Sequence, residues 1–208
     1  MTPQDPPPPY RRLARRSLPT ETTALAQFLI GKVLVHDGPA GRVAGRIVET
    51  EAYLPGDAAA HSFRGKTKRN QSLFLPRGHA YVYFIYGTWF AMNVSGGAAG
   101  IGAGVLLRAA EPLEGVALMQ ARRPHSIPHR LAAGPGCLAT AFAIDRTHDG
   151  QDLCGGGPLW LGSWGRGGHA VRLGTSVRIG ITKETHRHLR YYLRGHPAVS
   201  GPRHLSPG

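Results

Sequence analysis

The chain has 208 residues, and 25 lysine and arginine side chains outnumber 12 aspartate and glutamate side chains, which gives a formal net charge of +13. This length fits one globular domain with a buried core, and the charge favours a polyanion, nucleic acid first, as partner. No run of 18 apolar residues occurs, which excludes a membrane-spanning helix. Cys137 and Cys154 fit unlinked thiols in a cytoplasmic protein, and no zinc-site spacing is present.

The first elements along the chain are an arm and a helix. Residues 1–18 are rich in proline and arginine with few apolar anchors, which predicts a disordered or loosely docked arm. A helix is expected over 22–30, with Thr20 or Thr22 as its cap and Gly31 at its end. A sheet is expected to follow this helix.

Two strands joined by a turn are expected at 32–36 and 41–53, where apolar and polar side chains alternate. At a side-chain period of two, the second strand carries two glutamates on one face. Two acids on one face of an apolar strand are unusual in a basic protein and indicate a chemical or structural role. The expected face comprises Ile47, Glu49, Glu51 and Tyr53, and the opposite face comprises Val48, Thr50 and Ala52.

The rest of the chain alternates strands, loops and helices without any repeat. The expected elements are a surface loop (57–72), a β-hairpin (80–95), a glycine-rich connector (96–104), a strand (105–109), a helix that begins near Glu111, a second helix (134–144) and strands within 171–182 and 191–193.

The loop at 57–72 is polar and basic. It fits either contacts with phosphates or a solvated loop without a partner. Its basic side chains are Arg64, Lys66, Lys68 and Arg69.

The hairpin at 80–95 is dense in aromatic residues, with six of the 16 in the chain between positions 81 and 90. Core packing explains Phe84 and Phe90, because strands favour aromatic side chains. Tyr86 precedes the turn glycine at the expected tip and is harder to bury. It fits a wedge between bases as well as core packing, and Tyr81 and Tyr83 could form stacking walls beside a base.

The motifs occur in the order GRVAGRIVETEAY, AAHS, TKRN, GHAYVYFIYG, MNVS, GVLLRAAEPLEG, GPG, QDL, RIGIT and YYLRG. In this order they resemble the alkyladenine (3-methyladenine) DNA glycosylase family, from about residue 18 to about residue 200. The segments ETEAY, YVYFIYG and LLRAAEPLEG are long and specific. The chain is therefore identified as similar to this family over nearly its whole length.

The resemblance implies an α+β fold, a single mixed domain with a curved, mainly antiparallel sheet, flanking helices and a protruding β-hairpin. It implies a monofunctional DNA glycosylase that flips alkylated or deaminated purines out of duplex DNA. Hydrolysis of the N-glycosidic bond would leave an abasic site for base excision repair. No cofactor and no metal are expected.

The resemblance also implies the catalytic groups. Glu51 would activate the attacking water and Arg108 would help to hold it, with the backbone carbonyl of Ile179 as a third contact. Two positions depart from the family: Cys137 stands where lysine is usual, and Trp89 where tyrosine or histidine is more frequent.

The same resemblance implies the contacts with the base and the DNA. Tyr53, His61 and Tyr83 would form the walls around the flipped base, and His61 would also offer it a hydrogen bond. Asn93 would crowd the amino group of normal guanine. Tyr86 would be the intercalating wedge.

The proposed chemistry is also consistent with the residues themselves. Cleavage of a purine glycosidic bond develops positive charge on the sugar, which a carboxylate stabilises while it takes a proton from water. Glu49 fits a structural ion pair with Arg46 or Arg108. A glycoside-hydrolase pair of acids is the alternative, but side chains two apart on a strand lie about 6–7 Å apart, which leaves little room for a sugar. A lyase step needs an amine nucleophile, and the four lysines mark none.

The expected organisation is an arm (1–18), a glycosylase domain (19–200) and a flexible tail (201–208). The protein is expected to act as a monomer on duplex DNA in the cytoplasm, with the nucleoid if bacterial, without a membrane or an obligate protein partner. The alternative is a non-catalytic RNA- or DNA-binding module with the same hairpin and basic surface. Base excision would distinguish the two.

Overall fold

Antiparallel pairing joins nine strands into one sheet in the computed structural model, which describes residues 10–164 and 172–207. The strands are β1 (Arg11–Arg12), β2 (Val33–Gly38), β3 (Gly41–Tyr53), β4 (Ala80–Ile85), β5 (Trp89–Ser95), β6 (Gly104–Glu114), β7 (Leu159–Ser163), β8 (Leu173–Ser176) and β9 (Arg190–Leu193). The helices are α1 (Thr22–Leu29), α2 (Val116–Arg122) and α3 (Pro135–Ala141).

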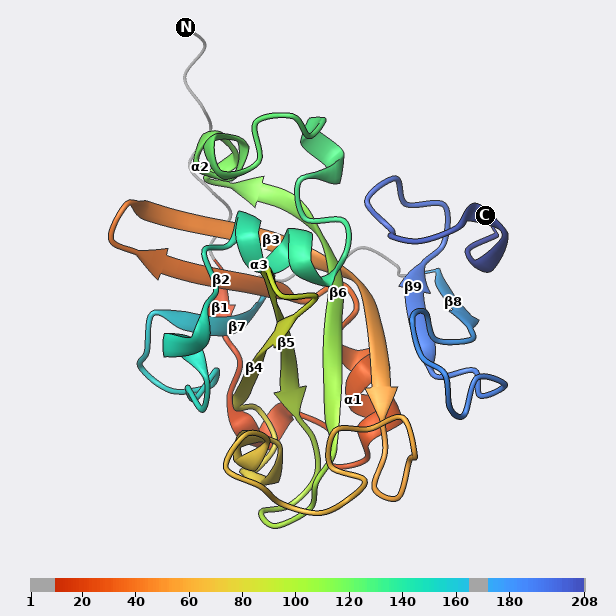
Figure 1. Cartoon of the computed structure of the whole chain (residues 1–208). Coiled ribbons are helices and arrows are strands. Elements are labelled where there is room, and N and C mark those ends of the chain that lie inside the picture. Colours follow the sequence, from red (N-terminus) through yellow and green to blue (C-terminus); the bar gives the residue numbers. More distant parts are fainter. Residues whose placement is uncertain (1–9, 165–171, 208) are drawn as a thin grey trace, which may run out of the picture.

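The strand order is β1-β7-β2-β3-β6-β5-β4, and β9 pairs with both β3 and β8 (Figure 1). Every pairing is antiparallel. The sheet is open and does not curl on itself. With the three helices it confirms the α+β class, the single domain and the antiparallel sheet.

Helix α1 packs against β3. Glu21 caps this helix, and its carboxylate accepts two backbone N–H groups of the first turn at 3.0 and 2.6 Å. The expected caps, Thr20 and Thr22, are wrong, because Thr22 already lies inside the first turn. Gly31 follows the helix with a φ of 84°, as expected for a glycine at a helix end.

A β-bulge in β3 decides which of its side chains reach the core. The pairing with β6 shifts register between Ile47 and Glu49. Ile47 therefore packs in the main core with Ala52, whereas Val48 lies in a separate small cluster. The expected alternation is wrong at Ile47 and Val48, because one extra residue reverses the faces. Glu49 and Glu51 keep their shared face beyond the bulge.

Strand β6 is longer than expected, and α2 begins later. Glu111, where a helix was expected to start, pairs with Arg46 of β3. Partners on β3 thus extend the strand as far as Glu114. Gly115, with a φ of 68°, ends it, and a Cβ at this position would lie 2.2 Å from the carbonyl oxygen of Arg42. A helix starting at 111 would lose the pairing with β3.

Strands β1 and β7 were not expected, and they bring the N-terminal segment onto the sheet. Strand β7 pairs with β2 and with β1. Leu13 and Leu18 are buried, and Arg15 forms a 2.6 Å ion pair with Asp152. Residues 10–18 are therefore docked rather than disordered, and residues 1–9 of the expected arm lie outside the described residues.

Both expected strands near the C-terminus are present, and the first of them is shorter than expected. Strand β8 covers only Leu173–Ser176, and Val171 lies outside the described residues, whereas β9 matches the expected strand at 191–193. The division of the chain at residues 18 and 200 stays a prediction. The segment after β9 lies beside that strand (Figure 1).

Two buried histidines meet behind β2. His36 Nδ1 lies 2.7 Å from the carbonyl oxygen of Phe142, and its Nε2 lies 3.2 Å from Nε2 of His148. A carbonyl only accepts, so His36 Nδ1 carries a hydrogen and its Nε2 accepts from His148. Burial is the main cause of the lowered pKa of His36. Repulsion from His148 and Arg122 lowers the pKa further, whereas the Phe142 carbonyl and Asp37 act in the opposite direction without reversing the shift.

This arrangement predicts acid-sensitive stability. The unfolded chain takes up a proton on His36 at its ordinary pKa near 6.5, and the folded chain only at lower pH, so the free energy of unfolding falls as the pH drops below about 6.5. Urea unfolding of wild type and His36→Gln at pH 7.5 and 5.5 measures this. The decrease should be smaller in the variant, and equal decreases would contradict the assignment.

Candidate active site

A cavity of about 700 Å³ opens between the β4–β5 hairpin, β6, the loop after β3 and the segment after β8. The first and last of these segments are more than 100 residues apart in the sequence, and the fold brings them together. Among the predicted site residues, the cavity is lined by Tyr53, His61, Tyr83, Tyr86, Asn93, Arg108 and Ile179.

Glu51 lies behind the wall of this cavity and is fully buried. Its Oε1 accepts the backbone N–H of Ile179 at 2.8 Å and lies 3.1 Å from Arg108 Nη1. Its Oε2 accepts the hydroxyl of Tyr53 at 2.9 Å. Three groups that line the cavity thus hold both oxygens of the carboxylate. The expected role of the Ile179 carbonyl stays a prediction, because the observed contact is through its N–H.

Tyr53 contributes both a ring and a hydrogen bond to the site. Burial and the adjacent Glu51 carboxylate raise the pKa of Tyr53. Its hydroxyl therefore stays protonated and donates a hydrogen bond to Glu51. The guanidinium carbon of Arg178 lies 4.6 Å from the centre of the Tyr53 ring. This cation–π contact fixes the ring that forms part of the cavity wall.

Arg108 connects the two glutamates of β3. Its Nε donates to Glu49 Oε1 at 2.8 Å, and its Nη1 faces Glu51. Burial alone would lower the pKa of Arg108, but the Coulombic attraction of Glu51 and Glu49 raises it, so the guanidinium stays charged. The geometry therefore places one cation between two buried carboxylates, and the same cation also lines the cavity.

Glu49 is a fully buried structural acid, as the sequence predicts. Of its two expected partners, Arg108 is confirmed and Arg46 is wrong, because Arg46 pairs with Glu111 at 2.7 Å. The second partner is Arg190, whose Nε donates to Glu49 Oε1 at 2.6 Å. The glycoside-hydrolase alternative is not supported, because Glu49 is engaged by two arginines rather than exposed to a substrate.

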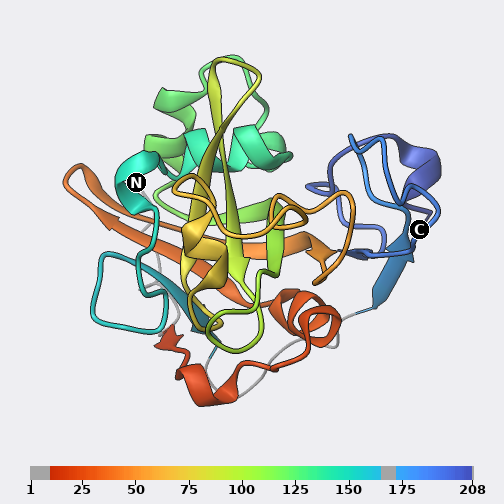
Figure 2. The same cartoon turned by 60° about the horizontal axis from the view of Figure 1, so that its bottom comes forward.

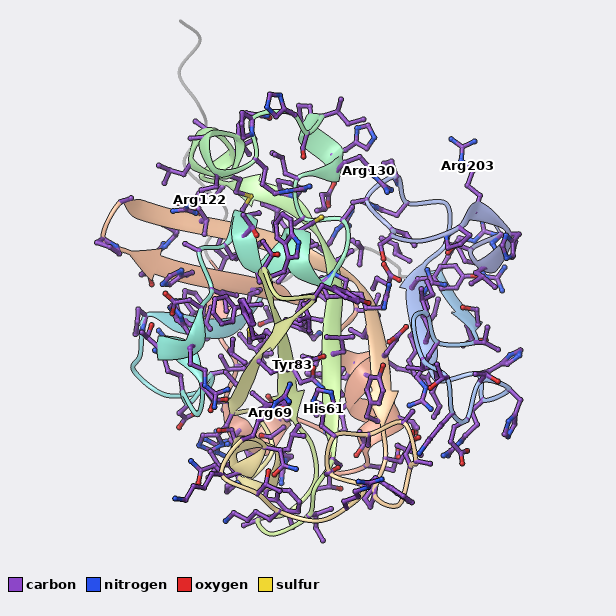
Figure 3. All side chains as sticks on the ribbon, viewed as in Figure 1. His61, Arg69, Tyr83, Arg122, Arg130 and Arg203 are labelled. Atoms are coloured by element: carbon purple, nitrogen blue, oxygen red, sulfur yellow. The ribbon has the colours of Figure 1, made fainter. Side chains whose placement is uncertain are left out.

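An aromatic cluster forms one wall of the cavity. The rings of Tyr81 and Tyr83 stack with their centroids 5.0 Å apart. The centroid of the His61 ring lies 4.5 Å from that of Tyr83, and Figure 3 shows these two side chains close together. Tyr81 is fully buried behind Tyr83 and does not line the cavity, so it supports the wall instead of forming it. Burial, with a smaller contribution from Arg69, lowers the pKa of His61 and favours the neutral ring.

The β4–β5 hairpin extends to the edge of the molecule (Figure 2). Tyr86 stands at its tip, 86% exposed, and has a φ of 50°, which is unusual for a residue other than glycine. Gly87 follows with a φ of 68°, so both residues adopt the backbone of a tight hairpin turn. Phe84 is 49% exposed, so its expected core position is wrong, whereas Phe90 packs partly buried against the core.

The two departures from the family pattern lie together at the cavity. Trp89 and Cys137 both line it, and Cys137 is a free thiol. Gly136 packs against Trp89 so closely that a Cβ there would lie 3.2 Å from the Trp89 side chain. The glycine at position 136 therefore lets the start of α3 lie close against residue 89.

The segment at 57–72 is the expected surface loop. Its four predicted basic contacts are all exposed. Asn70 anchors the loop from below, donating from Nδ2 to the carbonyl oxygens of His61 and Gly65 at 2.9 and 3.0 Å. The anchored loop holds the four cations next to the His61 edge of the cavity. These cations are Arg64, Lys66, Lys68 and Arg69.

Sequence reasoning missed a buried ion pair between Asp57 and Arg178. Arg178 donates from Nη1 to Asp57 Oδ2 at 2.5 Å and from Nη2 to Oδ1 at 3.1 Å, and both side chains are fully buried. Arg178 also donates to the carbonyl oxygen of Ala52 at 3.1 Å. The only signal in the sequence is that each partner adjoins a motif with predicted site residues.

Among residues 10–164 and 172–207, no group of three or more histidine, cysteine, aspartate or glutamate side chains could hold a metal ion. Within the same part of the chain, no helix has the length and apolar character needed to cross a membrane.

A cavity with aromatic walls is typical of enzymes that act on a nucleobase. The family comparison is specific. Residues 16–197 match the family described as methylpurine-DNA glycosylase (MPG), and the chain belongs to this family. It is thus a DNA glycosylase, a hydrolase of N-glycosyl bonds that serves DNA repair, rather than a non-catalytic binding module.

Relatives resemble the chain over most of its length. A protein of Mesorhizobium japonicum is 56% identical over 193 residues, 93% of this chain and 92% of the relative. A protein of Paraburkholderia phytofirmans is 51% identical over 198 residues, which cover 95% of this chain and 92% of the relative. A protein of Methanoculleus marisnigri is 47% identical over 182 residues, which cover 86% of this chain and 94% of the relative. Each is named "Putative 3-methyladenine DNA glycosylase".

The buried pair of Asp57 and Arg178 predicts a large effect on stability. Asp57→Ala leaves a buried guanidinium without its carboxylate and should lower the free energy of unfolding by about 3–5 kcal/mol. Arg42→Ala, which removes a partner of the half-exposed pair with Asp37, should cost at most about 1 kcal/mol. Urea unfolding at pH 7.5 measures both. Similar losses of unfolding free energy in the two variants would show that the buried pair of Asp57 and Arg178 stabilises the fold no more than a surface pair does.

Proposed function

We propose that this enzyme takes an alkylated or deaminated purine out of duplex DNA and into the cavity. A water activated by Glu51 then hydrolyses the N-glycosidic bond and leaves an abasic site. The observation that carries this proposal is the placement of Glu51. Glu51 is fully buried, and groups that line the cavity bind both of its oxygens, which supports a role for it beside an extruded nucleotide.

Each step of the reaction has a group to serve it. When the C1′–N bond breaks, the bonding electrons stay with the purine and positive charge develops on the sugar, where the Glu51 carboxylate stabilises it. The water oxygen then bonds to C1′, and its proton passes to Glu51. Arg108 orients the water from the same side, and the fixed N–H of Ile179 and hydroxyl of Tyr53 keep the carboxylate from rotating.

The cavity walls support a preference for damaged purines. A cationic base such as 3-methyladenine gains about 0.5–2 kcal/mol from aromatic faces, which Tyr53 and Tyr83 supply. A neutral lesion such as hypoxanthine lacks this gain and relies on a hydrogen bond from His61. Asn93 is buried in the lining and would crowd the exocyclic amino group of guanine.

The outer surface supports DNA binding. Tyr86, which is 86% exposed at the hairpin tip, would enter the base stack as a wedge and partly offset the cost of unstacking, about a few kcal/mol per step. The four exposed cations of the 57–72 loop would contact phosphates. Such contacts make affinity fall with salt by a log–log slope of about −0.9 per neutralised phosphate. We also infer a monomer that works with the DNA in the cytoplasm, without an obligate protein partner.

The test of the proposed function is Glu51→Gln. This change keeps the shape of the side chain but removes the base, so single-turnover excision of hypoxanthine from a duplex should fall at least about 100-fold. Release of 3-methyladenine from alkylated DNA should fall in parallel. Glu111→Gln, which alters an acid outside the cavity lining, should keep the wild-type rate. Equal rates for Glu51→Gln and wild type would exclude Glu51 as the base.

The wedge is tested with Tyr86→Ser. The variant should bind a lesion-containing duplex about tenfold more weakly, because nothing fills the gap left by the extruded base. Its thermal unfolding should match wild type, since the side chain is 86% exposed. Ile127→Ser, which removes another exposed apolar side chain, is the control and should bind normally. Unchanged duplex binding and excision by Tyr86→Ser would remove the wedge from the proposal.

A further inference from the structure

We propose that the C-terminal segment from Ser200 to Ser206 is a positioning element of the active site, acting on Arg108 through Ser200 and Arg190. The inference rests on the proposed role of Arg108 beside Glu51. The sequence predicts a flexible tail from residue 201, whereas the described part of this segment, up to residue 207, lies against β9 (Figure 1).

Ser200 contacts both members of the Glu49–Arg108 pair. Its backbone N–H donates to Glu49 Oε2 at 2.7 Å, and its hydroxyl accepts from Arg108 Nη2 at 3.3 Å. Ser200 is 4% exposed, so water does not compete freely for these bonds. The three nitrogens of the Arg108 guanidinium are thus held by three different partners: Glu49 at Nε, Glu51 at Nη1 and Ser200 at Nη2.

Three partners on three different nitrogens fix the orientation of a guanidinium as well as its position. With only the two carboxylates, the plane of the Arg108 guanidinium could still tilt about the line through its contacts with Glu49 and Glu51. The hydroxyl of Ser200 stops this rotation. Arg108 Nη1 is then kept 3.1 Å from Glu51, the geometry that the proposed chemistry requires.

Arg190 links the rest of the C-terminal segment to the same carboxylate. It is fully buried, and its Nε donates to Glu49 Oε1 at 2.6 Å. Its Nη1 donates to the Ser176 hydroxyl at 2.8 Å and the Leu205 carbonyl at 2.9 Å. Its Nη2 donates to the Ser200 carbonyl at 3.0 Å and the Ser206 hydroxyl at 2.8 Å.

All five N–H groups of Arg190 therefore have acceptors, and three of these acceptors come from the C-terminal segment. Arg190 and Arg108 both donate to Glu49. A shift of Arg190 would therefore move the Glu49 carboxylate and change its hydrogen bond with Arg108. Two carboxylates and two guanidiniums balance in charge within this cluster, which allows it to be buried.

The experiment compares Ser200→Ala with Ser200→Thr in the full chain. Ser200→Ala removes the acceptor of Arg108 Nη2 and keeps the backbone N–H to Glu49, whereas threonine restores a hydroxyl. We expect Ser200→Ala to lower the single-turnover excision rate about tenfold while the Kd for the lesion duplex changes less than twofold. Ser200→Thr should recover most of the rate. Ser163→Ala, which removes a half-buried hydroxyl at the end of β7 outside the cavity lining, should match wild type.

The outcomes separate positioning from simple stability. A wild-type rate in Ser200→Ala, a loss that threonine fails to restore, or a loss confined to Kd would overturn the proposal. Ser206→Ala removes one acceptor of Arg190 and gives a second, milder test, with an expected loss of about threefold in rate at unchanged Kd. If Glu51→Gln is inactive and both serine variants are normal, only this inference fails. If Glu51→Gln is active, the proposed function fails first.

Discussion

The structure depends on one buried carboxylate held between two arginines. Glu49 accepts from Arg108 and Arg190 on a single oxygen, at 2.8 and 2.6 Å, and from the backbone of Ser200 on the other. Removal of any one of these charges would leave a partner buried without compensation, which costs several kcal/mol. The pairing therefore ties β3, β6, β9 and the C-terminal segment into one arrangement. The position of Glu51, two residues further along β3, follows from it.

A second buried ion pair, between Arg178 and Asp57, holds other groups that bind Glu51. Arg178 pairs with Asp57, stacks on the Tyr53 ring and precedes Ile179, whose N–H binds the Glu51 carboxylate. The wall of the cavity and the donors to the carboxylate are thus set by the same guanidinium. Two buried pairs on either side of one acid give it little freedom to move. Such preorganisation favours electrostatic stabilisation of charge that develops during a reaction.

The basic surface and the hairpin are organised differently, because they face solvent. Tyr86 and the cations of the 57–72 loop make few contacts within the protein, so their geometry depends on what lies beneath them. Asn70 anchors the loop, and the stacked pair of Tyr81 and Tyr83 supports the base of the hairpin. Rigid supports under exposed side chains reduce the conformational entropy that binding to DNA would cost.

Sequence alone determined the class of fold and the hairpin with Tyr86 near its tip, because local alternation and turn chemistry specify them. It also predicted seven of the residues that line the cavity, through the resemblance of long motifs to a known family. It did not determine the reversal at Ile47, the extension of β6 through Glu111 or the docking of the C-terminal segment. Those features depend on partners that are far apart in the chain: a bulge requires the register of a second strand, and Arg190 finds its acceptors only when β9 and the tail meet. Only the tertiary structure decided that Glu49 binds Arg190 rather than Arg46, since several arginines could satisfy one carboxylate and the packing of the sheet selects among them.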